Sequence, residues 1–228
     1  MRSVSKKVNK VLVIDVGGTH VKVRTTGQGE ERKIPSGLTM TATKMVRDVK
    51  RLTKGWKYGR VSIGYPGPVV HGHPLHEPHN LGGGWVGFNF RKAFRRPVKV
   101  INDAAMQALG SYRGGRMLFL GLGSGLGSAM IVDGILQPME LAHLPYKNGK
   151  TYEDYVGVRA LKRLGKKRWR RYVTDVISRL KDALEADYVV LGGGNAKHIK
   201  KPPPHTRMGN NRNAFVGGFR LWQANTKA

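Results

Sequence analysis

Short apolar runs that end in glycine clusters constrain the fold of this chain more than any other feature. Val11–Asp15, Met117–Leu120 and Tyr188–Leu191 are each followed, within three residues, by at least two glycines. Short β-rich runs bounded by turn residues are typical of buried strands. Open α/β sheets place their functional loops at such strand ends, so the pattern predicts an α/β chain with sites in its glycine loops.

Further elements alternate with these strands. The spacing of apolar residues predicts a hairpin of Val11–Asp15 with Val21–Arg24, helices over Thr41–Lys54, Asp103–Ser111, Glu153 to about Leu184 and Asn213 to about Asn225, and strands over Arg60–Gly64, Val98–Ile101 and Ala129–Val132. Residues 71–84, rich in Gly, Pro and His, are predicted to be a loop. We expect a small N-terminal α/β lobe over residues 1–101 and a larger C-terminal α/β lobe over 102–228, with the last helix able to pack back on the first.

Charge and cysteine content exclude several classes of protein. The 228 residues carry 41 Lys and Arg against 14 Asp and Glu, a formal net charge of +27, and 39% of them are hydrophobic. A disordered chain would be poorer in apolar residues, so the excess charge decorates a folded body. The chain has no cysteine, which excludes disulfides, thiolate zinc sites and cysteine nucleophiles.

The longest uncharged stretch does not predict a membrane span. It runs over residues 117–132, contains four glycines and two serines, and falls short of the ~20 apolar residues that a membrane helix needs. The apolar run Val11–Ile14 is too short for the core of a signal peptide, and Asp15 interrupts it. We therefore expect a cytoplasmic protein without a membrane partner.

Two glycine loops are candidate phosphate sites. Asp15-Val-Gly-Gly-Thr19, with Lys22 downstream, can offer backbone N–H groups and a hydroxyl to a phosphate and a carboxylate to Mg²⁺, although a plain hairpin turn would have the same residues. Gly121-Leu-Gly-Ser-Gly-Leu-Gly127 is neither a P-loop nor a dinucleotide motif, because it lacks Gly-Lys-Ser/Thr and a strand follows it. Together they indicate two walls facing one phosphate chain.

Polar residues at other predicted strand ends are candidates for acid–base and sugar chemistry. Asp103 follows Asn102 at the end of a strand and the start of a helix, where it can act as a helix cap or as a general base. Glu140, His143 and Glu153 lie in an otherwise apolar neighbourhood. Converging carboxylates and imidazoles can hold sugar hydroxyls, although such residues near loops are usually only solvated.

The ordered set of motifs resembles the ROK family of sugar kinases, and within it the polyphosphate glucokinases. The resemblance spans residues 11 to about 222 and rests on Asp15-Val-Gly-Gly-Thr19, Gly64-Tyr-Pro-Gly67, Asn102-Asp103, Gly123-Ser-Gly-Leu-Gly127, Glu140-Leu-Ala-His143, Leu191-Gly-Gly-Gly194 and Phe215-Val-Gly-Gly218. It implies the actin-like ATPase fold, two α/β lobes of ribonuclease H type with the active site in a central cleft.

The resemblance also implies a role for each motif. Asp103 would be the catalytic base, Asn80, Asn102, Asp103, Glu140, His143 and Glu153 would bind the sugar, and Asp15 would hold Mg²⁺ through water. The phosphoryl donor would lie against Asp15, Gly17, Gly18, Thr19, Lys22, Gly123, Ser124, Gly125, Gly192, Gly193 and Gly194. The expected reaction is phosphoryl transfer from inorganic polyphosphate or ATP to a hexose hydroxyl, with glucose 6-phosphate as the product, by a protein that can form a homodimer.

Departures from the family pattern refine these expectations. Many ATP-using members carry a cysteine-rich zinc motif after the Glu-x-Gly-His element, and this chain has no cysteine, so no zinc site is expected. Ala142 stands where that element has Gly, and Ser124 stands where the second phosphate motif usually has Thr. Both replacements keep the main functional groups.

A basic run leaves the nature of the donor open. Leu161–Arg171 carries seven Lys or Arg in eleven positions, and Trp169 and Tyr172 lie among the charges. A polyanion such as polyphosphate would be steered to this surface, as a nucleic acid would be. The alternatives are an ATP-dependent ROK hexokinase and a non-catalytic nucleic-acid-binding relative, and a solvated helix face is the plainest interpretation of the run.

Overall fold

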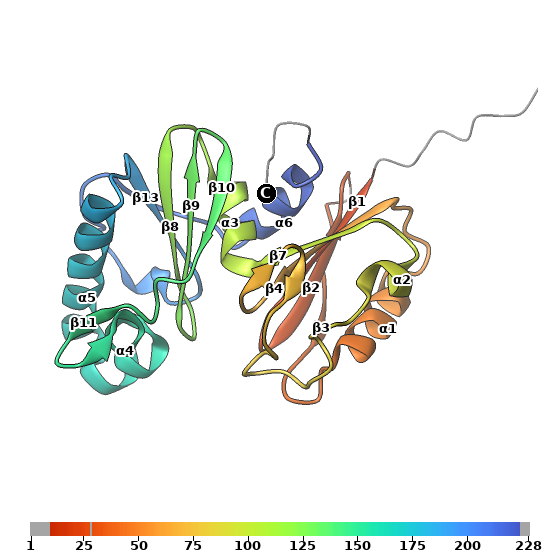
Figure 1. Ribbon diagram of the computed structural model, residues 1–228, viewed down its shortest axis with the longest axis horizontal. Helices are drawn as coiled ribbons and strands as arrows, with labels where there is room; N and C mark the ends of the chain where they lie inside the picture. Colours follow the sequence, from red (N-terminus) through yellow and green to blue (C-terminus); the bar gives the residue numbers. More distant parts are fainter. Residues whose placement is uncertain (1–9, 28, 224–228) are drawn as a thin grey trace, which may run out of the picture. The chain divides into compact units, whose positions relative to one another are not determined.

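The computed structural model describes residues 10–27 and 29–223, and these divide into two compact units. The first unit ends at Asp103 and the second begins at Ala104. Each is a mixed α/β unit built on one five-stranded sheet (Figure 1). The boundary predicted from the sequence, after residue 101, lies two residues earlier.

The sheet of the first unit has the strand order β3-β2-β1-β4-β7. Its strands are β1 (Val11–Val16), β2 (His20–Thr25), β3 (Arg32–Pro35), β4 (Arg60–Tyr65) and β7 (Val98–Asn102). The β1–β2 and β2–β3 pairs are antiparallel, whereas β1–β4 and β4–β7 are parallel. The predicted hairpin, which is β1 and β2, and the two predicted later strands, which are β4 and β7, are confirmed. Strand β3 was not predicted. Its residues alternate in exposure but do not form an apolar run.

Two helices and a small hairpin complete the first unit. They are α1 (Ala42–Leu52), α2 (Phe90–Phe94), β5 (Val69–Val70) and β6 (His73–Pro74). The predicted loop over residues 71–84 is mostly irregular, with the single strand β6 inside it. Trp85 is fully buried in this unit, donates its ring N–H to the carbonyl of Gly82 at 2.7 Å and packs on Tyr65 at 5.6 Å between ring centroids.

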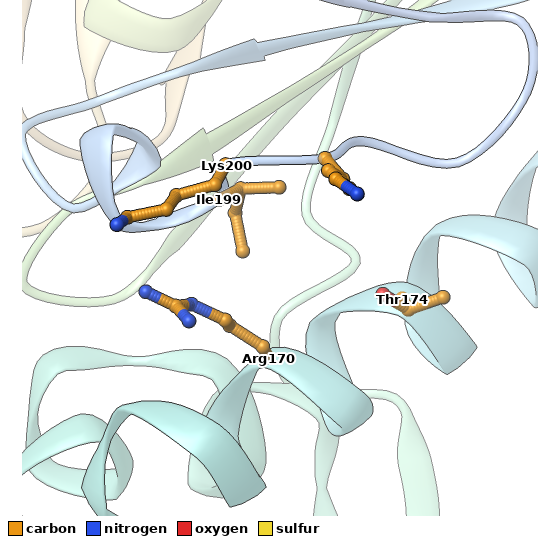
Figure 2. Close-up of a pocket in the computed structure, with 5 residues that line it drawn as sticks. Arg170, Thr174, Ile199 and Lys200 are labelled. Atoms are coloured by element: carbon orange, nitrogen blue, oxygen red, sulfur yellow. The ribbon is translucent and has the colours of Figure 1, made fainter.

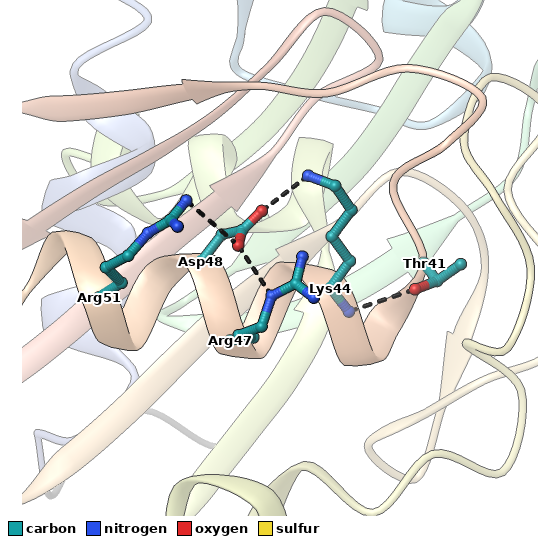
Figure 3. A network of polar contacts seen from close by, with 5 residues as sticks. All are labelled: Thr41, Lys44, Arg47, Asp48 and Arg51. Atoms are coloured by element: carbon teal, nitrogen blue, oxygen red, sulfur yellow. Dashed lines mark hydrogen bonds and ion pairs between the residues drawn. The ribbon is translucent and has the colours of Figure 1, made fainter.

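Helix α1 carries Asp48, which is the least exposed of the carboxylates that form ion pairs in the described part of the first unit (Figure 3). Thr41 caps the helix by accepting the N–H of Lys44 at 3.2 Å. Asp48, 7% exposed, accepts a hydrogen bond from the Lys44 ammonium at 2.7 Å and one from the Arg47 guanidinium at 3.1 Å, and Arg51 lies 3.6 Å away. The hydrogen bond from Lys44 is the main reason that the pKa of Asp48 is held below its usual value.

Replacing Asp48 is expected to destabilise the fold. Asp48→Asn leaves three neighbouring cations without their counter-charge, and we expect the free energy of unfolding at pH 7 to fall by about 1–3 kcal/mol. Because the folded-state pKa is lowered, the contribution is present above the unfolded-state pKa and is lost as the pH falls through the folded-state pKa. Denaturant unfolding across pH should therefore bring wild type and variant together at low pH. Asp182→Asn, at a 77% exposed carboxylate, is the control and should change little.

The sheet of the second unit has the strand order β10-β9-β8-β13-β14. Its strands are β8 (Arg116–Leu122), β9 (Leu126–Val132), β10 (Ile135–Met139), β13 (Tyr188–Gly192) and β14 (Thr206–Met208), and a two-stranded pair is formed by β11 (Pro145–Lys147) and β12 (Lys150–Thr151). The β8–β9 hairpin and β13 confirm the predicted strands around two of the glycine clusters. The short strands β10 to β12 and β14 were not predicted, because most of their residues are polar or exposed.

The long helical stretch predicted from Glu153 to about Leu184 is two helices. They are α4 (Tyr152–Val156) and α5 (Val158–Ala183). Gly157 between them is extended, with φ −70° and ψ 171°, and Gly165 interrupts α5 with φ 70°. Trp169 of α5 is fully buried and donates its ring N–H to the carbonyl of Val156 at 2.9 Å, which holds the two helices together. No helix in the described part of the chain combines the length and apolarity needed to cross a bilayer.

Helix α6 (Asn213–Arg220) packs on α3 (Asp103–Ser111) through glycine. A Cβ at Gly217 would overlap the carbonyl of Met106, and the Arg220 guanidinium donates to the carbonyl of Leu109 at 2.6 Å. The helix ends five residues before the predicted end at about Asn225, which lies outside the described residues. The remaining described helix is η1 (Ala196–His198), one 3₁₀ turn after β13.

Candidate functional site

Three parallel strands of the first unit end at one edge of its sheet and carry the candidate residues there. The register places Asp15 of β1 opposite Gly64 of β4, and Gly64 opposite Ile101 of β7. Asn102 and Asp103 follow directly. Since neighbouring strands lie ~4.8 Å apart, the ends of β1 and β7 are separated by about 10 Å. The sheet therefore gathers the first phosphate motif and the candidate base at one edge.

Asp15 and Lys22 face each other across the β1–β2 pair. Burial raises the pKa of Asp15 from 3.8 to about 6, the positive charge of Lys22 lowers it, and the negative charge of Glu31 raises it. The carboxylate is thus held at a strand end where ionisation is costly, and a further cation beside it would favour the ionised form.

The glycine turn after β1 is held by backbone contacts. The N–H of Gly17 donates to the carbonyl of His20 at 3.0 Å, and the Ser36 hydroxyl donates to the carbonyl of Gly17 at 2.6 Å. Gly18 lies against Asn80, because a Cβ at Gly18 would be 3.2 Å from the Asn80 Cβ. The structure thus brings Asn80, a predicted sugar ligand, to the loop predicted to bind the donor, while Thr19 is exposed beside them.

Asn102 and Asp103 occupy the junction between β7 and α3. The Asn102 amide donates to the carbonyl of Gly67 at 3.1 Å, which ties the end of β7 to the Gly64-Tyr-Pro-Gly67 motif. Asp103 is the first residue of α3, where the helix macrodipole stabilises a negative charge. An ionised carboxylate at this position can accept a proton.

In the second unit, the glycine loop between β8 and β9 encloses the carboxylate of Glu153. This carboxylate accepts the N–H of Leu126 at 3.1 Å, and any side chain at Gly125 would overlap it. The carbonyl of Ser124 accepts the N–H of Val158 at 3.1 Å. Gly123, by contrast, has open space where a Cβ would be. The loop is therefore packed against α4 and the start of α5 on one side and open at Gly123.

Glu140, His143 and Glu153 form one electrostatic group. Desolvation raises the pKa of Glu140, His143 lowers it and Glu153 raises it further. The N–H of Glu153 donates to the carbonyl of Ala142 at 3.0 Å, which joins the two motifs through the backbone. The three side chains predicted to hold a sugar are thus neighbours in one unit.

Ser128 and Asn195 are two residues of this region that the sequence did not single out. The buried Ser128 hydroxyl donates to the carbonyl of Met139 at 3.0 Å and accepts the N–H of Leu141 at 3.1 Å, so it fixes both neighbours of Glu140. The Asn195 amide donates to the carbonyl of Gly123 at 2.8 Å. The position of these two polar residues beside glycine motifs was a signal that the sequence offered. The backbone groups that they bind are far away in sequence, so the sequence did not reveal these contacts.

The three glycines Gly192, at the end of β13, and Gly193 and Gly194, directly after it, differ in their surroundings. A Cβ at Gly192 would overlap the ring of Phe119, and Gly193 has φ +81° and packs on the backbone of Leu122. Gly194 is open and exposed. Packing alone therefore accounts for Gly192 and Gly193, whereas the space at Gly194 is available to a ligand.

The candidate residues thus form two groups, one in each unit. The first unit holds Asp15, Gly17, Gly18, Thr19, Lys22, Asn80, Asn102 and Asp103, and the second holds Gly123, Ser124, Gly125, Glu140, His143, Glu153, Gly192, Gly193 and Gly194. Two surface hollows among the described residues are lined by other residues. One lies between α5 and the segment after η1, and the other between the ends of α1 and α2.

Comparison with known proteins gives a matching family model and similar sequences. A model of the ROK family matches residues 11–138, more than half of the chain. The polyphosphate glucokinase of Mycobacterium tuberculosis strain CDC 1551 is 29% identical over 217 aligned positions, which cover 84% of this chain and 80% of that protein.

Solved structures agree in fold. The inorganic polyphosphate/ATP-glucomannokinase of Arthrobacter sp. strain KM is 26% identical, with a TM-score of 0.75 over 92% of this chain and 97% of that one. A ROK family glucokinase from Streptomyces griseus, solved in complex with glucose and AMPPNP, is 16% identical, with a TM-score of 0.75 over 93% of this chain and 99% of that one. The predicted actin-like ATPase fold is confirmed.

Proposed function

This chain belongs to the ROK family and is a sugar kinase, and on that premise we propose that it transfers a phosphoryl group from inorganic polyphosphate to a hexose, with glucose as the acceptor and glucose 6-phosphate as the product. The observation that carries the proposal is the contact of Glu153 with the Gly123–Gly125 loop. The Glu153 carboxylate thus belongs to the group of side chains suited to sugar hydroxyls and also contacts a loop suited to phosphate.

The acceptor sugar is held by groups that match its hydroxyls. Carboxylates accept hydrogen bonds from hydroxyls, whereas an imidazole can donate or accept them. Glu140, His143 and Glu153 supply these groups in the second unit. The resemblance to the family adds the amides of Asn80 and Asn102, which belong to the first unit. Holding the attacking hydroxyl in line with the donor accounts for much of the rate in reactions of this kind.

Asp103 is the proposed catalytic base. Its carboxylate accepts the proton of the sugar hydroxyl as the oxygen attacks the terminal phosphorus, and the bond from that phosphorus to the bridging oxygen of the donor breaks. The shortened polyphosphate leaves with the electron pair of that bond. Backbone N–H groups of the two glycine loops, together with Lys22, stabilise the charge on the phosphoryl oxygens.

Magnesium fits this site through Asp15 and the donor together. Within the described residues no three His, Asp or Glu side chains cluster as metal ligands, so the chain alone provides no closed cage. Mg²⁺ commonly binds one or two carboxylates and takes its other ligands from water and substrate phosphates. Bound there, the ion would neutralise charge on the donor phosphates. Asp15 would hold it through water.

Several observations favour polyphosphate over ATP as the donor. Gly192 and Gly193 are filled by packing within the protein, which leaves little of this turn for a nucleoside. A net charge of +27 exceeds what a single nucleotide requires, whereas a long polyanion is attracted to an extended basic surface. Similar proteins named above are a polyphosphate glucokinase and a polyphosphate/ATP-glucomannokinase. Use of ATP as a second donor is compatible with the same loops.

Two glycines of one loop provide a matched test of the donor site. Gly123→Ala introduces a methyl group into open space, so we expect unchanged stability and a KM for polyphosphate raised about 3- to 30-fold, with the KM for glucose unchanged. Gly125→Ala instead collides with the Glu153 carboxylate and should raise the KM for both substrates. Steady-state kinetics with both substrates varied, alongside thermal unfolding, would distinguish the two. Equal kinetic effects of the two variants would contradict an open donor site at Gly123.

The sugar group is tested by truncation. Glu140→Ala or His143→Ala removes a hydrogen bond to a hydroxyl, and unpaired partners cost about 1–3 kcal/mol. We therefore expect the KM for glucose to rise by roughly 5- to 150-fold, with a much smaller change in the donor KM. Initial rates of glucose 6-phosphate formation with magnesium and polyphosphate give both constants. A matching rise in both KM values would indicate a structural role and contradict the assignment.

A further inference from the structure

A hollow of about 310 Å³ lies between helix α5 and the segment that follows η1 (Figure 2). Arg170 and Thr174 line it from successive turns of α5, and Ile199, Lys200 and Lys201 line it from the other side. Figure 2 shows the charged ends of Arg170 and Lys200 on the same side of the hollow, with space between them. Ile199 is 6% exposed and lies between these two side chains.

The walls of this hollow come from stretches without acidic residues. The chain has no Asp or Glu between Asp154 and Asp175, and none after Asp187. Asp175, one residue beyond Thr174, is bound instead by Tyr146, Lys147 and Arg179. Neither of the two segments that line the hollow therefore contributes a carboxylate that could balance the positive charge there.

A second observation shows that this charge is concentrated. The Arg170 guanidinium donates to the carbonyl of His198 at 2.6 Å, which fixes the cation against the end of η1. The pKa of His198 is lowered, first by desolvation and then by the charges of Lys166, Lys197 and Arg170. Three cations, Arg170, Lys200 and Lys201, thus line the hollow, and Lys166 and Lys197 lie close enough to His198, whose carbonyl Arg170 binds, to act on its ring. Like charges gathered in this way repel one another, and a bound anion would relieve that repulsion.

We infer that this hollow binds successive phosphates of the polyphosphate donor, beyond those held at the glycine loops. The inference rests on the proposed function and identifies where the rest of the donor chain is held. Gly194, the open glycine after β13, is six residues before Lys200 in the same unit, which is at most about 22 Å of chain. A flexible chain of many phosphates can span even this upper limit, whereas ATP carries only three phosphates.

Inorganic polyphosphate fits the hollow better than a nucleic acid does. Binding of single-stranded nucleic acid relies on aromatic side chains on which bases stack. Trp169 is fully buried, and Tyr172 packs against Tyr155 with ring centroids 4.7 Å apart, so neither lies free beside the basic residues of α5. The lining residues carry two ammonium groups, a guanidinium and a hydroxyl, which suit phosphate oxygens, and include no aromatic ring.

Direct binding tests the hollow without turnover. The probes are tripolyphosphate and long-chain polyphosphate, titrated calorimetrically into the wild type and into Lys200→Gln with Lys201→Gln, in the absence of sugar and over a salt series. We expect the double variant to bind long-chain polyphosphate about 10-fold more weakly. Its slope of log K against log salt should be smaller by about 1.4, by analogy with ~0.7 per contact in single-stranded nucleic acids.

The matched control removes the same charge elsewhere on the same helix. Lys162→Gln with Arg168→Gln changes two exposed cations of α5 that do not line the hollow, and we expect less than a 3-fold effect. Thr174→Glu places a carboxylate at the hollow and should weaken binding at least as much as the double lysine variant. An equal loss in the control, or unchanged binding in the lysine variant, would overturn the inference.

Two further outcomes separate this inference from the proposed function. If the wild type binds long-chain polyphosphate through Lys200 and Lys201 but transfers none of it to glucose, the proposed function fails and the binding site remains. If single-stranded DNA displaces polyphosphate from the hollow and binds more tightly at the same salt concentration, the hollow is a nucleic-acid site and the inference is overturned.

Discussion

Asp103→Asn is expected to lower kcat for glucose phosphorylation by roughly 10²- to 10⁴-fold while the KM for glucose stays within a few-fold of wild type. The amide keeps the shape of the carboxylate at the first residue of α3 but cannot accept the proton of the attacking hydroxyl. Single-turnover measurements at saturating donor and sugar would report the chemical step itself.

A matched substitution and a stability measurement accompany this prediction. Asp182→Asn removes a carboxylate that is 77% exposed in the same chain and should leave kcat unchanged. Thermal unfolding checks that Asp103→Asn remains folded. A folded Asp103→Asn variant with kcat within a few-fold of wild type would show that another group accepts the proton.

Asp15→Asn is expected to abolish donor-dependent turnover and, at the same time, to stabilise the protein above pH 6. Burial raises the pKa of Asp15 from 3.8 to about 6, so the folded state binds this proton more tightly than the unfolded state. The favourable contribution is present below the unfolded-state pKa and is lost as the pH rises through the folded-state pKa. The difference between the two pKa values corresponds to about 3 kcal/mol of unfolding free energy. The wild type loses this free energy as the pH rises, whereas the variant, with its neutral amide, does not.

The test is the free energy of unfolding as a function of pH, with chelator present so that no magnesium is bound. The advantage of Asp15→Asn over wild type should grow between pH 3.8 and about 6 and then remain constant. Asp48→Asn provides the contrast, because the pKa of Asp48 is lowered and its replacement should destabilise the protein at neutral pH. A pH-independent difference between wild type and Asp15→Asn would contradict the burial of this carboxylate.

Local patterns in the sequence were sufficient for most of the regular structure. The β1–β2 hairpin follows from the alternation of apolar and charged residues in Val21–Arg24 beside a glycine turn. The strands β8 and β13 follow from apolar runs that end in glycine. Short polar strands such as β14 depend on pairing with a neighbour, here β13, and carry no pattern of their own.

The helix from Glu153 onward shows where a periodic pattern misleads. The apolar spacing continues through Gly157 and Gly165, and only the backbone angles show that the chain breaks at the first and bends at the second. A Cβ at Gly157 would lie 2.9 Å from the carbonyl of Glu153, so the break depends on close packing that the sequence does not reveal. Directly after the break, the N–H of Val158 donates to the carbonyl of Ser124 at 3.1 Å, which ties the start of α5 to the Gly123–Gly125 loop.

The candidate site was predicted as a set of residue types, and the structure adds the contacts among them. That Asn80 packs on Gly18, and that Ser128 holds the backbone on both sides of Glu140, follows from tertiary structure alone. The sequence also did not distinguish the three consecutive glycines of which the first ends β13. Packing distinguishes Gly192 and Gly193, which the fold requires, from Gly194, which it does not.

The most direct test of the account is a competition between donors in one reaction. Purified protein is incubated with glucose, magnesium, long-chain polyphosphate and ATP at equal phosphoryl concentration, with the label in only one donor at a time. We expect labelled glucose 6-phosphate to form mainly from polyphosphate, and to stop when magnesium is removed. If labelled glucose 6-phosphate formed only from ATP, or if none formed with either donor, the proposed phosphoryl transfer from polyphosphate to glucose would be contradicted.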